Sequence, residues 1–235
     1  MKNKKEINTN GHKYIDLDLP SGTLWATMNV GANKPSDFGL YFQWGDTKGY
    51  TKSQVGKNKR FSSNLSDYKW NPSGDDSAFT KYKTTGATLA LEDDAANKNM
   101  GGDWHMPTPE QIQELIDNTI STWTTKDGVN GKLFTSKNGN SIFIPAAGYA
   151  SDGSLLDSGS YGEVWSSMLS AGGVDYGQGL GFGSSGVNLG GYGRCGGLRR
   201  AWRAWLGFIY PTAQTNFLIG CLQGAPHPKS ILLEN

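Results

Sequence analysis

The first clear pattern along the chain is an alternation of polar and apolar residues from Tyr14 to Leu19. A period of two predicts a strand with one buried face, and the turn-forming residues at 20–22 end it. A second short strand is expected over 24–30. The aromatic residues within 38–45 are bounded by glycines, which is typical of a protein core.

Two polar stretches flank or interrupt this pattern. Residues 1–10 are expected to form a disordered tail, so the domain is predicted to begin near Gly11. Residues 46–86 are rich in Lys, Ser, Thr, Asp and Gly and carry isolated aromatic residues. We interpret them as a long surface loop held in place by its rings, not as a linker between domains.

Two helices are expected, over about 90–99 and about 109–119. The second has a clear start, because Thr108 can cap its N-terminus and Pro109 fits the first helical position. Its apolar residues recur at helical spacing and define one face, formed by Ile112, Leu115, Ile116 and Thr119.

Beyond the second helix the pattern is one of strands and turns up to about residue 200. A hairpin is expected over about 128–141, followed by a strand over 142–145. Small strands, two helices and long loops together predict the α+β class. Six large apolar side chains are expected to be buried: Trp25, Trp44, Trp104, Trp165, Leu180 and Phe182.

The amino-acid composition disfavours some classes of binding partner. The chain has 235 residues, of which 18% are charged, and its formal net charge is +1. Because basic and acidic residues are nearly equal in number, the chain has no overall positive electrostatic potential that would attract nucleic acid or an anionic membrane. No nucleic acid partner is therefore expected. No apolar run approaches the roughly 18 residues of a membrane span. The basic start leads to no apolar stretch, so a signal peptide is expected to be absent or already removed.

Glycine is concentrated in one segment. Residues 171–197 hold 12 of the 33 glycines, and Leu180 and Phe182 alternate there with glycines. Alternation predicts a strand with a core face and a face without side chains, with Gly179, Gly181 and Gly183 pointing outward in one plane with Gly190, Gly191 and Gly193. A low-complexity glycine-rich loop is the alternative interpretation. A phosphate-binding loop is disfavoured, because no helix start or Lys-Ser/Thr pair follows.

Several motifs resemble one known family. YIDLDLPSGTLWATMNVGANKPSDFGLYFQWGD, LEDDAA, GGDWHMPTPEQIQELID, NGNSIFIPAAGY and YGEVWSS occur in this order over about residues 11–200. They are similar to the signatures of the Fibrobacter succinogenes major paralogous domain family, although His105 stands where that family more often has Arg. The resemblance implies a C-type-lectin-like fold, shared with formylglycine-generating enzymes.

Members of this fold also serve as variable proteins of diversity-generating retroelements, in which codons are rewritten at adenines. Such rewriting converts Asn codons into Gly, Ser or Asp codons and Tyr codons into Cys codons. The resemblance therefore implies a ligand-binding display protein with a variable region at about 171–197. The implied ligand-binding residues are Gly172, Gly173, Asp175, Gly177, Gly179, Gly181, Gly183, Gly186, Gly190, Gly191, Gly193, Cys195 and Gly196.

The implied partner is a protein or glycan ligand on a cell surface, and the chain itself is expected on a cell surface or a phage particle. A face of glycines offers backbone groups and little else, so this copy is expected to bind weakly or not at all. No catalytic residue, metal or cofactor is expected. A surface adhesin or carbohydrate-binding module without diversification is one alternative, and a degenerate oxidase of the formylglycine-generating kind is another.

Competing sites within the domain are disfavoured. Asp93 and Asp94 beside Glu92 could bind calcium, but a solvated first helical turn is the preferred interpretation. An oxidase needs two closely spaced cysteines, whereas Cys195 and Cys221 are far apart in sequence. Whether these two cysteines form a disulfide stays open.

The segment 201–235 departs from the family pattern. Arg residues beside Trp202 and Trp205 could form a basic amphipathic segment on a membrane surface. Alternatively, the segment is the product of a frameshift, because residues 200–207, if encoded by permissive codons, give a family-like ending when read one base later. No function is assigned to this tail.

Overall fold

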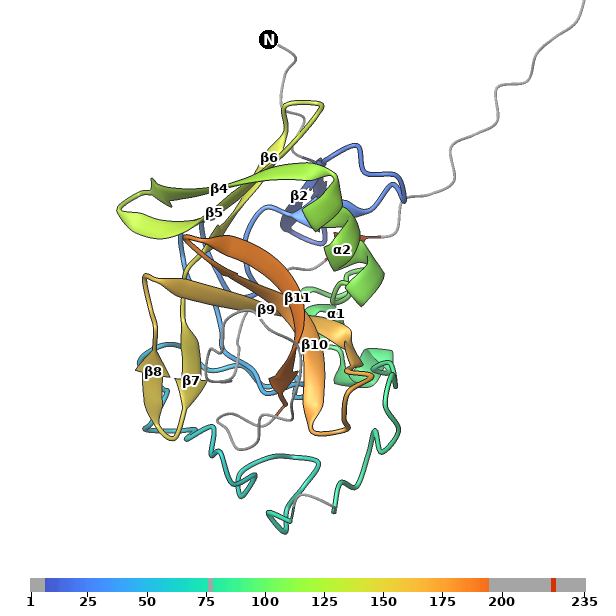
Figure 1. Ribbon diagram of the computed structural model, residues 1–235, viewed down its shortest axis with the longest axis vertical. Coiled ribbons are helices and arrows are strands. Elements are labelled where there is room, and N and C mark those ends of the chain that lie inside the picture. The colour runs from blue at the N-terminus through green and yellow to red at the C-terminus, as the bar shows by residue number, and fades with distance from the viewer. Residues whose placement is uncertain (1–6, 76–77, 195–220, 223–235) are drawn as a thin grey trace, which may run out of the picture.

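The computed structural model describes residues 7–75, 78–194 and 221–222 of the chain. Within them, four small antiparallel sheets and two α-helices surround a common core (Figure 1). This arrangement confirms the α+β class. The finer assignment to a C-type-lectin-like fold stays a prediction.

The first sheet contains the N-terminal strands in the order β1-β2-β3-β12. Its members are β1 (Ile7–Thr9), β2 (His12–Asp16), β3 (Leu24–Ala26) and β12 (Cys221–Leu222). Residues 7–9 of the tail expected over 1–10 thus form a strand that pairs with β2, and residues 1–6 lie outside the described residues. The strand expected over 14–19 ends at Asp16, and Asp18 has a positive φ of 53° that is incompatible with extended backbone.

The second sheet, β4-β5-β6, follows helix α2 and forms the upper part of the molecule in Figure 1. Its strands are β4 (Thr119–Lys126), β5 (Val129–Ser136) and β6 (Ser141–Pro145). The strand expected over 142–145 is present as β6, whereas the range of the expected hairpin, 128–141, contains the single strand β5 and the turn after it, and β5 forms hairpins with both β4 and β6. A separate two-stranded sheet consists of β7 (Tyr149–Ser151) and β8 (Ser154–Leu156).

The third sheet contains the glycine-rich segment, in the order β11-β10-β9. It consists of β9 (Tyr161–Leu169), β10 (Tyr176–Gly183) and β11 (Gly186–Gly193). A two-residue turn, Ser184 and Ser185, joins β10 to β11. The segment is therefore an ordered hairpin, which decides against a low-complexity loop.

The helical region has three short elements: the 3-10 helix η1 (Leu91–Asp93), α1 (Ala95–Met100) and α2 (Pro109–Asp117). Helix α2 starts as expected, because the Thr108 hydroxyl accepts a hydrogen bond from the Gln111 amide and the Gln111 side chain bonds back to Thr108. Its buried residues Ile112 and Leu115 belong to the hydrophobic core, and the helix contacts β4, β9, β10 and β11.

The core is dominated by aromatic side chains. All six side chains expected to be buried are buried, each with 1% or less of its surface exposed. The indole nitrogens of Trp44 and Trp165 donate to the carbonyl oxygens of Ser166 and Phe42, at 2.9 and 3.2 Å. The strands and the 38–45 cluster are thus connected by buried hydrogen bonds as well as by packing.

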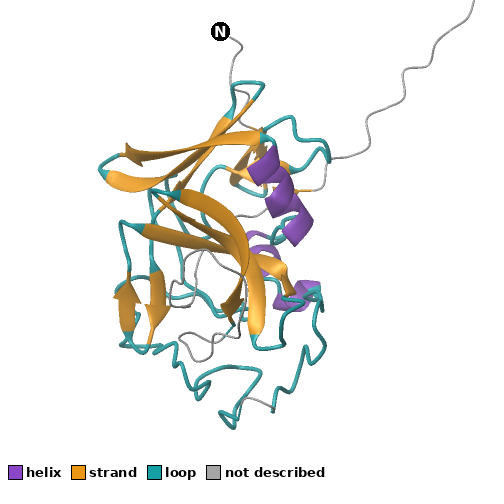
Figure 2. Cartoon of the chain, viewed as in Figure 1, coloured by secondary structure: helices purple, strands orange, loops and turns teal. Residues whose placement is uncertain are grey.

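The described residues of 46–86 form a long loop without a helix or ladder strand (Figure 2). Its rings hold it against the domain, as expected. Tyr50, Phe61, Tyr68 and Phe79 are buried, and the Tyr68 hydroxyl donates to the Trp44 carbonyl oxygen at 2.8 Å. Among all described residues, no helix has the length and apolar character needed to cross a bilayer.

Candidate functional site

Three of the four glycines of β10, Gly177, Gly179 and Gly181, are packed against neighbouring groups, whereas Gly183 is half-buried and has room for a β-carbon. A β-carbon at Gly177 would lie 2.5 Å from the Trp44 ring, and one at Gly179 would lie 2.5 Å from the Val164 carbonyl oxygen. At Gly181 it would overlap the hydroxyls of Tyr192 and Tyr161. The expectation that Gly179 and Gly181 point into solvent is therefore wrong, because aromatic side chains from neighbouring strands fill that face.

The strand register also divides the glycines that were expected to be coplanar. Gly179 pairs with Gly190, whereas Gly191 and Gly193 pair with Gln178 and Tyr176. Since alternate residues of a strand lie on opposite faces, Gly190 shares the face of Gly179 and Gly181, and Gly191 and Gly193 lie on the other face. Leu180 and Phe182 are buried, as expected.

The predicted ligand-binding residues differ in how much of their surface is exposed to solvent. Gly177, Gly179 and Gly181 are buried, whereas Gly172, Gly186 and Gly191 are exposed. Five are half-buried, namely Gly173, Asp175, Gly183, Gly190 and Gly193. Cys195 and Gly196 lie outside the described residues. Around Gly186 nothing lies within 4 Å of an added β-carbon, and its φ is outside the left-handed region.

A polar cluster lies over the packed glycines of this sheet. The register pairs Gly181 with Glu163 on β9 and with Asn188 on β11, so these side chains share one face. The Asn188 amide donates to the Tyr192 hydroxyl at 3.2 Å, and this hydroxyl lies 3.5 Å from that of Tyr161. We call Tyr161, Glu163, Asn188 and Tyr192 the tyrosine cluster.

The tyrosine cluster runs from the interior to the surface. Glu163 and Tyr192 are buried, Tyr161 is half-buried and Asn188 is exposed. Burial raises the pKa of Glu163 well above its usual value, and the hydrogen bond from Tyr161 only partly opposes this shift. Burial also raises the pKa values of Tyr161 and Tyr192. The interior of the cluster thus favours a protonated Glu163 and neutral tyrosines, and only Tyr161 and Asn188 reach the surface.

Sequence reasoning missed this cluster. It concentrated on the glycines, whereas the groups that can bind a ligand come from the residues that cover them. Tyr161, Glu163 and Trp165 alternate along β9, as do Asn188, Gly190 and Tyr192 along β11. That alternation is visible in the sequence, but only the strand register shows that the two sets share a face.

No family model, curated protein or solved structure matches the chain. The family resemblance therefore stays a prediction from the motifs.

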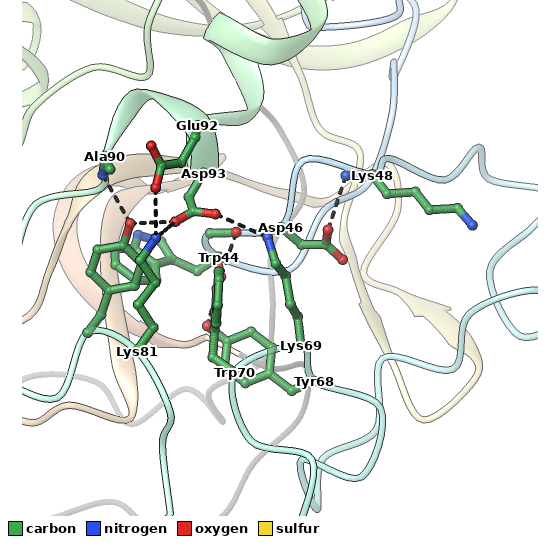
Figure 3. Close-up of polar contacts among 12 residues, drawn as sticks. Trp44, Asp46, Lys48, Tyr68, Lys69, Trp70, Lys81, Ala90, Glu92 and Asp93 are labelled. Atoms are coloured by element: carbon green, nitrogen blue, oxygen red, sulfur yellow. Dashed lines mark hydrogen bonds and ion pairs between the residues drawn. The ribbon is translucent and has the colours of Figure 1, made fainter.

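Glu92 and Asp93 belong to a second polar cluster, shown in Figure 3. Asp93 is buried, and its carboxylate bonds to the ammonium groups of Lys69 and Lys81 and to the Tyr82 hydroxyl. Although burial raises the pKa of Asp93, these hydrogen bonds outweigh it and lower the pKa overall. Lys69 and Lys81 also lie over the Trp70 ring, at 4.2 and 5.1 Å from its centroid.

Asp94 has a different structural role. It caps α1, because its carboxylate accepts from the Asn97 amide at 2.9 Å, and it also accepts from the Met106 amide at 2.8 Å. Asp93 and Asp94 are 3% and 2% exposed, which corrects the interpretation of a solvated helical turn. Their oxygens are occupied by protein donors, and no group of three potential metal ligands occurs in the described part of the chain.

Two further polar side chains, those of Ser166 and His105, have local structural contacts. The Ser166 hydroxyl lies 3.4 Å from the Met168 carbonyl oxygen, in a fully buried position. His105 contacts the Met106 carbonyl oxygen through Nδ1, at 2.9 Å.

Proposed function

We propose that the chain is a ligand-binding display protein of C-type-lectin-like fold. Its binding surface is the outer part of the β10–β11 hairpin together with the tyrosine cluster. The partner is a neutral polar ligand, either a glycan or a protein surface presented on a cell. The exposed glycines Gly172, Gly186 and Gly191 are positions at which adenine-directed mutagenesis varies this surface.

The observation that carries this proposal is the contrast between packed and open positions within one hairpin. Gly177 and Gly181 lie against aromatic side chains and Gly179 lies against the Val164 carbonyl oxygen, whereas a β-carbon at Gly186 would meet no atom within 4 Å. A protein that varies its binding surface needs such a division, because changes at open positions leave the core intact.

The residues around the open positions are suited to recognition. Tyr supplies a large contact area with little loss of side-chain entropy, and Asn supplies adaptable hydrogen bonds. Tyr161 and Asn188 bring these groups to the surface end of the sheet, where both contact the buried Tyr192 hydroxyl. Codons for Asn and Tyr also contain the adenines that the proposed mutagenesis would rewrite.

Binding to arrays of glycans and cell-surface proteins tests the proposal. Wild type is expected to bind at least one neutral member, and Asn188→Ala and Tyr161→Phe are expected to weaken that binding about tenfold, equivalent to about 1.4 kcal/mol. Thr122→Ala, at an exposed site on β4, is the control. Equal binding by all four proteins would contradict the assignment of this surface.

A surface adhesin without diversification would use the same neutral surface, and the gene itself separates the two proposals. Diversification requires a nearby, near-identical repeat and a reverse transcriptase gene, with differences confined almost wholly to adenines. Differences spread over all four bases would favour the adhesin.

A further inference from the structure

Three asparagines of the chain, Asn10, Asn130 and Asn138, are each followed by glycine. Asn-Gly is the dipeptide in which asparagine loses its side-chain ammonia most readily, because glycine has no side chain to hinder attack by its own backbone nitrogen. The shared dipeptide gives the three pairs the same intrinsic reactivity. Their surroundings in the folded chain differ, and these surroundings decide which pair can react.

Asn130 is held within β5, the central strand of its sheet. Its side-chain oxygen accepts from the Thr125 hydroxyl at 2.8 Å, and its side-chain nitrogen donates to the Gly159 carbonyl oxygen at 3.0 Å. The following residue, Gly131, is buried. Reaction at this pair requires the sheet to be disrupted, so Asn130 is expected to be stable.

Asn138 lies in the exposed turn between β5 and β6, but its reacting groups are bonded. The side-chain nitrogen donates to the Asp16 carbonyl oxygen at 3.1 Å, and the side-chain oxygen accepts from the Asn140 amide at 2.8 Å. The attacking group is also occupied, because the Gly139 amide donates to the Ser136 carbonyl oxygen at 3.0 Å. These hydrogen bonds must break before the Gly139 nitrogen can reach the Asn138 side chain.

Asn10 and Gly11 form the two-residue turn between β1 and β2, and both are exposed. Their φ angles of 48° and 77° are typical of a type I′ hairpin turn. Within the part of the chain that the structure describes, neither the Asn10 carboxamide nor the Gly11 amide has a hydrogen-bond partner. The hydrogen bonds that restrain Asn138 and Gly139 thus have no counterpart here.

Opening this turn disturbs little of the fold. Strand β1 has three residues and is the edge strand of its sheet, where it pairs with β2 alone among the described strands. Local opening is easiest where few pairs have to be broken. Of the three asparagines, Asn10 therefore reaches the geometry for attack at the lowest cost in free energy.

We propose that Asn10 is a deamidation site of this chain. The Gly11 backbone nitrogen loses its proton and attacks the side-chain carbonyl carbon of Asn10. The new C–N bond closes a succinimide ring, while the C–N bond to the side-chain amide breaks and its nitrogen leaves as ammonia with the proton. Water then opens the ring at either carbonyl and leaves Asp or isoAsp at position 10. Water is the only other reactant, and nothing is oxidised or reduced.

The product changes the contacts of the turn. The side-chain nitrogen of Asn10 lies so close to Gly102 that a β-carbon there would overlap it. Because α1 ends at Gly101, the new carboxylate lies beside the negative end of this helix, where a negative charge is unfavourable. IsoAsp also adds a methylene group to the backbone of a turn whose register depends on its two-residue length. Both products are therefore expected to loosen the β1–β2 hairpin.

Peptide mapping by mass spectrometry tests the proposal after the folded full chain has been incubated at neutral pH in heavy-oxygen water. Heavy oxygen marks the reaction during incubation and separates it from reaction during digestion. Asn10 is expected to convert at least about tenfold faster than Asn138, whose hydrogen bonds must first break. The rate is expected to rise with pH, because the attacking nitrogen must lose its proton. A stable Asn10, or equal rates at positions 10 and 138, would overturn the proposal.

The same chain unfolded in guanidinium chloride is the matched control. All three asparagines are expected to react at similar rates there, because they share the dipeptide and have lost their different surroundings. If Asn10 were faster than Asn138 by the same factor in the unfolded chain, the folded structure would not select the site and the proposal would be wrong.

Two variants test the effect of the product on the hairpin. Asn10→Asp is expected to speed amide hydrogen exchange in β2, because it places the carboxylate beside the end of α1. Asn10→Gly adds no charge and tolerates the positive φ, so it is expected to exchange like wild type. Equal exchange in the two variants would contradict the expected loosening of the hairpin.

Discussion

Gly179 packs so closely against Val164 of the neighbouring strand that a β-carbon would lie 2.5 Å from the Val164 carbonyl oxygen. This oxygen belongs to the backbone of β9 and cannot move without disturbing the sheet. Glycine is therefore required at position 179 by packing, whatever the role of the exposed glycines in the same hairpin.

Gly179→Ala should consequently destabilise the protein. Forcing a methyl group into a packed sheet costs about 1–3 kcal/mol, measured as the free energy of unfolding in urea. Gly186→Ala is the matched control and should change stability by less than about 0.5 kcal/mol, because its β-carbon meets no atom within 4 Å. Equal effects at the two positions would contradict the division into packed and open glycines.

Glu163 should make stability fall as pH rises. Its pKa is raised in the folded state by burial, so the folded protein retains a proton that the unfolded chain releases above about pH 4.3. The free energy of unfolding therefore falls by up to about 1.4 kcal/mol per pH unit until the pH reaches the pKa of Glu163 in the folded protein.

Glu163→Gln keeps the shape and neutrality of the protonated carboxyl and should abolish this part of the pH dependence. Urea unfolding between about pH 4 and pH 8 measures the difference from wild type, which should widen with pH. Glu110→Gln, at an exposed position in α2, should leave the wild-type slope unchanged in this range. Parallel curves for wild type and Glu163→Gln would show that Glu163 is charged at neutral pH.

Asp93 should have the opposite pH dependence. Its pKa is lowered in the folded state, so the stability it contributes is complete above about pH 4 and is lost as pH falls through the lowered pKa. Asp93→Asn removes charge-assisted bonds to Lys69 and Lys81 and should cost about 2 kcal/mol at neutral pH.

Glu92→Gln is the control for Asp93. Glu92 bonds to the same Lys81 at 3.2 Å, but its side chain is 75% exposed, so its removal should cost less than about 0.5 kcal/mol. Similar losses for Asp93→Asn and Glu92→Gln would show that the buried carboxylate is not what attaches the 46–86 loop to the helical region.

Features with a local cause were predictable from the sequence. Thr108 and Pro109 define the start of α2 through backbone capping, which depends on adjacent residues only. The buried tryptophans were predictable because no other placement removes such large apolar surfaces from water. The turn at 20–22 was likewise specified by local residues.

Features that depend on distant neighbours were not predictable. The sequence shows that glycines alternate with Leu180 and Phe182, but it does not show that Tyr161 and Tyr192 cover Gly181 from two other strands. Likewise, Asp93 is buried because Lys69 and Lys81 arrive from the long loop to neutralise it. In both cases the partner lies too far along the chain for local pattern to identify it.

The most direct test of the display proposal is the tolerance of the hairpin to random substitution. One library varies the exposed positions 172, 186, 188 and 191, and a second varies the packed positions 177, 179 and 181. Both are sorted for folded protein and then for binding to glycans and cell-surface proteins. We predict that most members of the first library fold and that some bind new ligands, whereas most members of the second unfold. A first library that unfolds as often as the second, or folds without yielding any binder, would contradict the account.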